Sequence, residues 1–196
     1  MLDDSALDLL FREARTYRDF QPRPVSDDQL RAVYALARMG PTSANCQPAR
    51  FVFLRSTEAK ARLIPFLDKG NVRKVEAAAA TVIVAHDLHF HEQLTRIYPE
   101  DPRARTWFEG EARAAAVTEA AFRNGTLQGA YLIIAARALG LDIGAMSGFN
   151  NALVDEIFFP DGRFKSNFLC NIGYGDHSKL FNRSPRHSFE EACTLM

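Results

Sequence analysis

The sequence has little of what marks disulfide-bonded, zinc-bound or membrane-spanning proteins. It contains three cysteines, and no two of them form a CxxC pair, so neither a disulfide framework nor a structural zinc site is expected. Residues 1–10, MLDDSALDLL, lack the basic and then apolar pattern of a signal peptide. The apolar run GAYLIIAARALG is broken by Arg137 and is too short to span a bilayer. We therefore expect a soluble, cytoplasmic protein without a membrane partner.

An excess of charge of either sign is also missing. The chain has 24 Lys and Arg residues against 24 Asp and Glu residues, and this balance argues against nucleic acid as the main partner, because phosphate backbones attract basic proteins. No repeat, low-complexity tract or linker divides the 196 residues. A single core commonly reaches this size, so we expect one domain over residues 1–196.

The hydrophobic pattern predicts about six helices and three or four strands, which is an α+β fold rather than a regular βαβ alternation. Expected helices cover residues 3–15, 27–40, 57–67, 111–139 and 152–159, with Ser26, Thr57 and Asn150 as caps. Expected strands cover 49–56, 78–87 and 166–175. Residues 88–110 read as a helix plus an irregular lid, and 140–149 as a glycine-punctuated loop. The second half of the 111–139 helix is apolar nearly all round, which predicts a central buried helix.

Two polar clusters lie near the N-terminus. Arg15, Thr16 and Arg18 place two cations around a hydroxyl, which suits an anion such as phosphate; two solvated arginines at a helix C-terminus are the plainer explanation. The second cluster, GPTSANCQP at residues 40–48, carries two prolines and a run of small polar side chains. It could be a loop that satisfies its own hydrogen bonds or the wall of a site.

Two more candidate elements lie near the C-terminus. The loop GLDIGAMSGF has three glycines, which allow a ligand to approach the backbone. It matches neither a Walker loop nor a dinucleotide fingerprint, because no lysine follows and a helix precedes it. In the tail, Lys179, Arg183 and Arg186 could be solvated or could close on a phosphate.

Two other patterns carry less chemistry. Cys46 has no histidine near it in sequence, so we read it as an inert small residue rather than a nucleophile. His86, His89 and His91 have a spacing that could hold a metal, but they straddle a strand end and have no clear carboxylate partner besides Asp87. We expect no metal site.

Taken in order, the four polar elements resemble the FMN-dependent nitroreductase family. The chain has R-[ST]-x-R-x-F near its start, P-[ST]-S-x-N-x-Q-P after the second helix, a glycine loop ending in G-F, and a basic tail with R-x-S-F-E-E. The resemblance implies an α+β fold with a mixed central sheet flanked by helices. It also implies a homodimer with FMN at the subunit interface.

The resemblance further assigns roles to residues. Arg15, Thr16 and Arg18 would meet the FMN phosphate, ribityl chain or pyrimidine edge, and Arg186, with Arg183 as a second candidate, would bind the phosphate. The ring would lie between two walls, one formed by Met146, Ser147 and Gly148 and the other by Pro41, Thr42, Ser43 and Asn45 of the second subunit. The chain departs from many members at Ala14 and Ser184, where they carry cations, and at Ser147, where several carry a glutamate.

Within the family, the phrases GPTSANCQPAR, AFRNGTLQGAYLI, MSGF and NIGYGDHSKL are similar to a branch that reduces malonic semialdehyde to 3-hydroxypropionate with NAD(P)H in pyrimidine degradation. A substrate carboxylate needs a cation, and the lid offers Arg96, Arg103 and Arg105. Two alternatives stay open: a broad NAD(P)H nitroreductase or quinone reductase, and a flavin-binding protein without turnover.

Overall fold

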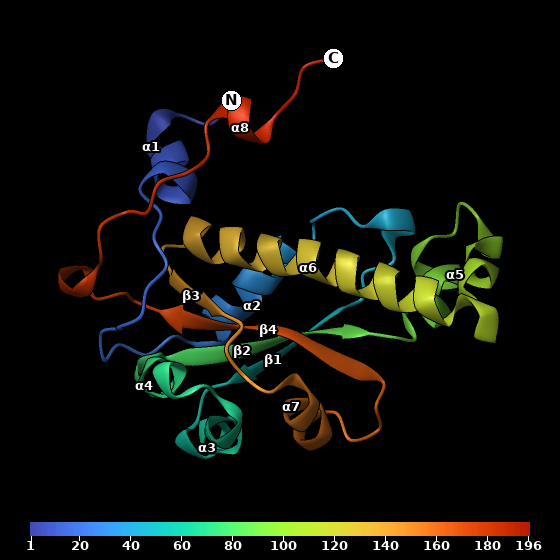
Figure 1. Cartoon of the computed structure of the whole chain (residues 1–196), viewed down its shortest axis with the longest axis horizontal. Coiled ribbons are helices and arrows are strands. Elements are labelled where there is room, and N and C mark those ends of the chain that lie inside the picture. The colour runs from blue at the N-terminus through green and yellow to red at the C-terminus, as the bar shows by residue number, and fades with distance from the viewer.

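The computed structural model describes residues 1–196 as helices on both faces of one sheet (Figure 1). Its α-helices are α1 (Asp4–Leu7), α2 (Asp27–Ala37), α3 (Thr57–Leu63), α4 (Lys69–Ala77), α5 (Leu94–Ile97), α6 (Ala114–Ala138), α7 (Asn151–Phe158) and α8 (Phe189–Ala192). The strands are β1 (Ala49–Leu54), β2 (Ala80–Asp87), β3 (Asp142–Met146) and β4 (Phe164–Gly173). A π-helical turn, Asp8–Arg12, extends α1, and short 3-10 turns fill the connections. No helix has the length and apolar content that a membrane span needs.

The sheet has the order β1-β2-β4-β3, and every neighbouring pair of strands is antiparallel. The α+β class is confirmed. The expected mixed sheet has only one parallel element, an isolated bridge between Thr16 and Ile143. It arises because the connector before α2, residues 13–26, runs beside β3 without forming a strand of its own.

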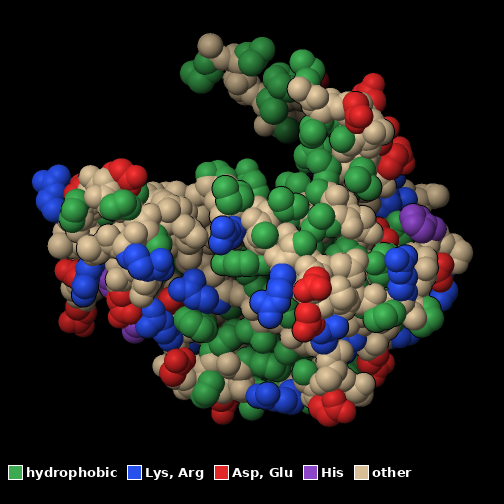
Figure 2. Space-filling view, turned by 180° about the vertical axis from the view of Figure 1, so that it is seen from behind, with side chains coloured by type: hydrophobic (Ala, Val, Ile, Leu, Met, Phe, Trp, Pro, Cys, Tyr) green, Lys and Arg blue, Asp and Glu red, His purple; other side chains and the backbone are tan.

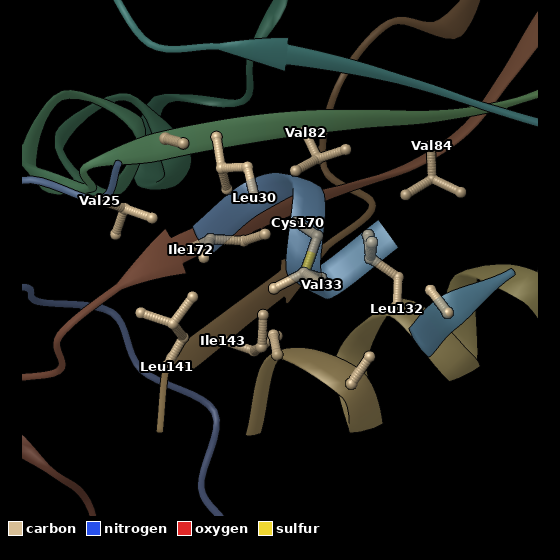
Figure 3. Packing of buried hydrophobic residues seen from close by; sticks show 14 residues of the cluster. Val25, Leu30, Val33, Val82, Val84, Leu132, Leu141, Ile143, Cys170 and Ile172 are labelled. Carbon is tan, nitrogen blue, oxygen red and sulfur yellow. The ribbon is translucent and has the colours of Figure 1, made fainter. Parts of the chain in front are cut away.

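Alternate residues of β2 face two cores. Val82 and Val84 point to α2 and α6, whereas Ile83 and Ala85 point to α3, α4 and α7. All eight residues of β2 are buried, as the unbroken apolar run predicts for a strand covered on both faces. Figure 3 shows the first core, in which Leu132 of α6 and Val33 of α2 meet the sheet beside Cys170.

The helix α6 lies very close to the sheet at two glycines. A Cβ on Gly125 would stand 2.9 Å from the Cβ of His86, and one on Gly129 would stand 2.6 Å from the ring of Phe168. The prediction that this helix is buried all round is wrong for the single chain: Leu127 is 47% and Tyr131 is 38% exposed. The sheet covers only one face of a helix, so the apolar residues of the opposite face stay open.

Three local predictions change. Residues 140–149 are not all loop, because β3 forms at Asp142–Met146 and pairs with β4; its glycines hid the strand pattern. The cap of α3 is Ser56, whose side chain accepts from the N–H of Ala59, and Thr57 is the first helical residue. Ser26 and Asn150 cap α2 and α7 as expected. The helix α4, which our sequence analysis missed, is short and mostly polar.

Candidate functional site

The connector before α2 lies against β3. The N–H of Tyr17 donates to the carbonyl of Ile143 at 2.8 Å, next to the Thr16 bridge. This approach requires a glycine opposite, because a Cβ on Gly144 would stand 2.4 Å from the carbonyl oxygen of Tyr17. The contact fixes Arg15 and Arg18 at one edge of the sheet.

The C-terminal tail meets the same segment. Arg183 donates to the carbonyl of Ala14 at 3.1 Å, and Arg15 donates to the carbonyl of Phe181. The guanidinium of Arg18 lies 4.5 Å from the centre of the Phe181 ring. Together they enclose a pocket of about 230 Å³ lined by Ala14, Arg15, Thr16, Arg18, Phe181, Asn182, Arg183, Ser184 and Arg186. The structure thus brings together Arg15, Thr16, Arg18, Arg183 and Arg186 from the two ends of the chain. Lys179, the third cation of the tail cluster, lies outside the pocket and is paired with Asp19 and Asp176.

This arginine pocket carries uncompensated positive charge. None of the ion pairs in the structure involves Arg15, Arg18, Arg183 or Arg186. Four guanidinium groups without a carboxylate suit an anion with several oxygens, since arginine binds phosphate through paired N–H donors. The donor set therefore fits a phosphate group.

A second group of residues follows the end of β3. The carbonyl of Gly148 accepts from the N–H of Asp68 at 3.0 Å and from the Asn71 amide at 2.8 Å. A Cβ on Gly148 would stand 2.6 Å from both side chains, so glycine is needed here. Met146 is half-buried and Ser147 is exposed. These residues lie along β3 from Ile143, where the connector binds.

The lysine Lys74 connects the two groups and was missed by sequence reasoning. Its ammonium donates to Asn71 Oδ1 at 2.8 Å. Burial, and then the neighbouring Arg18, lower the pKa of Lys74. A lysine beside an arginine, with no carboxylate of its own, is a further donor for an anionic ligand. In the sequence, both Lys74 and Asn71 look like ordinary polar surface residues, and only the tertiary contacts single them out.

The loop 41–47 has an unusual backbone. Ala44, Asn45 and Gln47 have φ values of 48°, 48° and 40°, in the left-handed region that costs a non-glycine residue about 1–2 kcal/mol. Hydrogen bonds within the loop support it: the N–H of Gln47 donates to Thr42 Oγ1 at 3.2 Å, and the Gln47 amide donates to Asn45 Oδ1 at 2.8 Å. Asn45 also donates to the carbonyl of Ile97 in the lid at 2.6 Å.

The predicted loop residues do not join the arginine pocket in the same chain. The N–H of Ser43 donates to Asn124 near the middle of α6, whereas Arg137, near the end of α6, lies by Arg183. A rise of 1.5 Å per residue separates these two helix positions by about 20 Å. Pro41, Thr42, Ser43 and Asn45 therefore stand apart from Arg15, Thr16 and Arg18.

A larger cavity of about 490 Å³ opens beside this loop. It is lined by Tyr34, Cys46, Gln47, Ala49, Arg50, Phe51, Phe53, Phe90, Gln93, Arg96, Ile97 and Gln128. Of the three lid arginines, only Arg96 lines it. Arg103 is paired with Asp101 and Arg105 with Glu109 on the exposed surface. Arg96 has no carboxylate partner and bonds only to Gln93, at 3.3 Å.

One buried carboxylate joins the lid to the sheet. Asp87, with a fully buried side chain, accepts from Arg50 at 2.7 Å and from two nitrogens of Arg163, each at 3.0 Å. The N–H of His89 also donates to it at 2.8 Å, and Arg163 continues to Glu92 of the lid at 3.0 Å. Arg50 is thus neutralised, which leaves Arg96 as the uncompensated cation of the cavity.

The remaining reactive side chains are inert or separated. Burial raises the pKa of the Cys46 thiol to about 11, so the thiol stays protonated at neutral pH and is a poor nucleophile. The ring of His86 is buried against Phe122, and the rings of His89 and His91 lie 6.3 Å apart beyond the end of β2. No three His, Cys, Asp or Glu side chains are grouped as metal ligands.

Solved structures resemble this fold over its whole length. A nitroreductase-type protein from Exiguobacterium sibiricum, solved in complex with FMN, superposes with a TM-score of 0.83 at 21% identity and covers 100% of this chain and 99% of its own. At that identity the likeness shows the fold alone.

Sequence relatives are much closer. A protein of Xanthomonas oryzae is 56% identical over 98% of this chain and 96% of its own length. A protein of Cupriavidus pinatubonensis is 51% identical over 100% of both chains. Both are named, provisionally, NADH dehydrogenase/NAD(P)H nitroreductase. The model of the nitroreductase family matches residues 11–174. The chain belongs to the nitroreductase family.

Proposed function

We propose that this chain is an NAD(P)H-dependent FMN oxidoreductase that acts as a homodimer. The observation that carries the proposal is the arginine pocket, in which Arg15, Arg18, Arg183 and Arg186 have no carboxylate partner. FMN ends in a phosphate, and this donor set fits it. The names of the relatives, which mention NAD(P)H, and the FMN-bound fold neighbour support the same reading.

Residues in and beside the pocket suit the rest of the cofactor. Thr16 and Arg18 would hold the ribityl chain and the pyrimidine edge, with Lys74 beside them. Met146, Ser147 and Gly148 would line one side of the ring, supported by the bond from Asn71 to the Gly148 carbonyl. FMN, when bound, supplies the carrier for a hydride. The part of Arg18 and Lys74 is to stabilise negative charge on the pyrimidine edge.

The second wall of the ring requires another subunit. Pro41, Thr42, Ser43 and Asn45 lie about 20 Å along α6 from the arginine pocket, as the helix rise requires. A two-fold axis across α6 would bring the loop of one subunit to the pocket of the other. Support comes from the exposed face of α6, where Phe122, Leu127 and Tyr131 are 52%, 47% and 38% exposed. Figure 2 shows apolar side chains gathered along the upper side of the body, beneath the projecting tail.

No protein nucleophile is needed for this chemistry. The protonated Cys46 stays outside it, and Thr42 and Ser43 offer hydroxyl groups of small volume that can contact a flat ring. Because Asn45 already donates to the lid, its role is to join the ring wall to the substrate side. A reducing cytoplasm, predicted from the cysteine content, suits the NAD(P)H that the scheme requires.

For the substrate, we propose malonic semialdehyde, reduced to 3-hydroxypropionate during pyrimidine degradation. Arg96 is our choice for the carboxylate clamp, since Arg103 and Arg105 are already paired with acids. One observation favours the broad nitroreductase or quinone reductase instead. The cavity of about 490 Å³ has the size of a drug-sized ligand site, larger than a three-carbon acid needs, and Tyr34, Phe51, Phe53 and Phe90 give it aromatic walls.

The test is a pair of half-reactions on the FMN-loaded protein without oxygen. NADPH or NADH should bleach the flavin absorbance, and malonic semialdehyde, a nitroaromatic or a quinone should then restore it. The specific function is supported if the flavin absorbance returns fast only with malonic semialdehyde. Arg96→Ala should then raise the KM for the semialdehyde at least tenfold, whereas Arg103→Ala should leave it unchanged. Recovery only with aromatic acceptors supports the broad one. A protein that takes up FMN and is never reduced by NAD(P)H is a binding protein, and one that takes up no FMN refutes the proposal.

A further inference from the structure

We infer that Asn124 and Gln128 of α6 are positioning residues that hold the loop 41–47 in its left-handed conformation. The inference rests on the proposed function only where it assigns that loop to the ring wall. The two amides are 97% and 95% buried on a helix that is otherwise mainly apolar on this face. A buried amide in an apolar helix must satisfy its polar atoms, so the partners of these two side chains show what they do.

Both partners are main-chain N–H groups at the two ends of the loop. The N–H of Ser43 donates to Asn124 Oδ1 at 2.9 Å. The N–H of Ala49 donates to Gln128 Oε1 at 2.8 Å. The two amides are four residues apart on the helix, hence one above the other on the same face. One rigid helix therefore holds the chain at Ser43, directly before the left-handed residues, and at Ala49, two residues after the last of them.

The orientation of the first clamp is itself fixed. Asn124 Nδ2 donates to the carbonyl of Ala120 at 2.8 Å, which turns Oδ1 toward Ser43. Gln128 Nε2 has no such bond, and Gln128 lines the cavity beside the loop. This difference predicts different tolerance. Glutamate at 128 keeps the accepting oxygen, whereas an acid at 124 would oppose the Ala120 carbonyl.

The clamp matters because the loop is strained. Ala44, Asn45 and Gln47 would relax out of the left-handed region if its ends were free. The bonds inside the loop connect its own residues and cannot place it relative to the helix. Asn124 and Gln128 fix the position of the loop along α6. Because α6 faces the dimer interface, they thereby fix the loop relative to the flavin of the partner subunit.

The test replaces each amide by an apolar residue of similar shape, Asn124→Leu and Gln128→Met, in the full-length protein. Gln128→Glu is the conservative variant. Thr118→Ala is the matched control, because the Thr118 hydroxyl bonds only to the Ala114 carbonyl of the same helix. The first measurement is amide hydrogen exchange of Ser43 and Ala49 without cofactor. The second is the FMN dissociation constant, with the visible circular dichroism of the bound flavin as a signature of ring placement.

We expect exchange of Ser43 to rise at least tenfold in Asn124→Leu and that of Ala49 likewise in Gln128→Met, while exchange in β2 stays as in the wild type. FMN should bind at least fivefold more weakly in both, with altered circular dichroism, and Gln128→Glu and Thr118→Ala should match the wild type. If Asn124→Leu does not fold, Gln128→Met and Gln128→Glu alone decide. Unchanged exchange, or released amides with unchanged FMN binding, overturns the inference. A wild type that binds no FMN refutes the proposed function instead, and the exchange result still decides whether the clamp exists.

Discussion

The substitution Gly144→Ala tests how the arginine pocket is built. Its new methyl group would stand 2.4 Å from the carbonyl oxygen of Tyr17, where ordinary contact begins at 3.4 Å. The connector or β3 must therefore move by about 1 Å, the difference between these distances. A shift of that size breaks the 2.8 Å bond from Tyr17 N–H to the Ile143 carbonyl.

The expected cost follows from two contributions. Overpacking of this kind costs about 1–3 kcal/mol, and loss of the hydrogen bond adds about 1 kcal/mol. For a domain of this size, Tm falls by roughly 2–4 °C for each kcal/mol, so Tm should drop by about 4–16 °C. Arg15 and Arg18 move with the connector. Loss of one charge-assisted bond, worth about 1.5–3 kcal/mol, weakens FMN binding by about tenfold or more.

The assay is thermal unfolding of the cofactor-free protein, followed by titration with FMN. Gly70→Ala is the matched control, because a Cβ there meets no heavy atom within 4 Å and the residue lies in α4. It should stabilise the protein by about 0.5–1 kcal/mol and leave FMN binding alone. If Gly144→Ala unfolds within 1 °C of the wild type (a change of about 0.5 kcal/mol or less) and binds FMN equally well, the docking of the connector on β3 is not what forms the pocket.

Two further predictions concern buried titratable groups. Asp87→Ala should lower the free energy of unfolding, measured in urea, by about 3–5 kcal/mol, because it leaves Arg50 and Arg163 without their buried partner. The control Glu109→Ala removes an exposed ion pair and should lower it by less than about 1 kcal/mol. Equal losses in the two variants would contradict the assigned roles. Burial lowers the pKa of His86 below 6.5, so the unfolded chain binds the proton more readily than the folded chain. The contribution of neutral His86 to stability is therefore complete above pH 6.5 and is lost as the pH falls through the lower pKa of the folded state. His86→Phe should flatten this part of the stability profile in urea titrations at pH 5–8, and an unaltered slope would assign it to other groups.

The sequence predicted those parts of the fold that depend on local pattern. Ser26 and Asn150 begin helices because their side chains accept the first free N–H groups. The strand β2 was readable because burial on both faces requires an unbroken apolar run. The strand β3 was not, because Gly144 is there for the sake of Tyr17, a contact that no local pattern contains.

The candidate site divides in the same way. Arg15, Arg18, Arg183 and Arg186 were found as two charged clusters, and the structure shows that they line one pocket. Lys74 and Asn71 were missed because their importance depends on Arg18 and Gly148, which are distant in sequence. The choice of Arg96 among three lid arginines also needed the structure, since only the ion pairs of the other two distinguish them.

The two glycines of α6 restrict how this protein can change over time. With Gly125 against His86 and Gly129 against Phe168, the helix cannot slide or roll on the sheet without a collision. Insertion of one residue before Gly125 would turn that end of the helix by about 100° relative to the sheet. The stretch of α6 from Ala120 to Gly129, where the helix packs against Phe168, should therefore keep its length during evolution. Surface loops are free of this restriction and can lengthen. Variants that alter substrate range are better sought in the lid than in this helix.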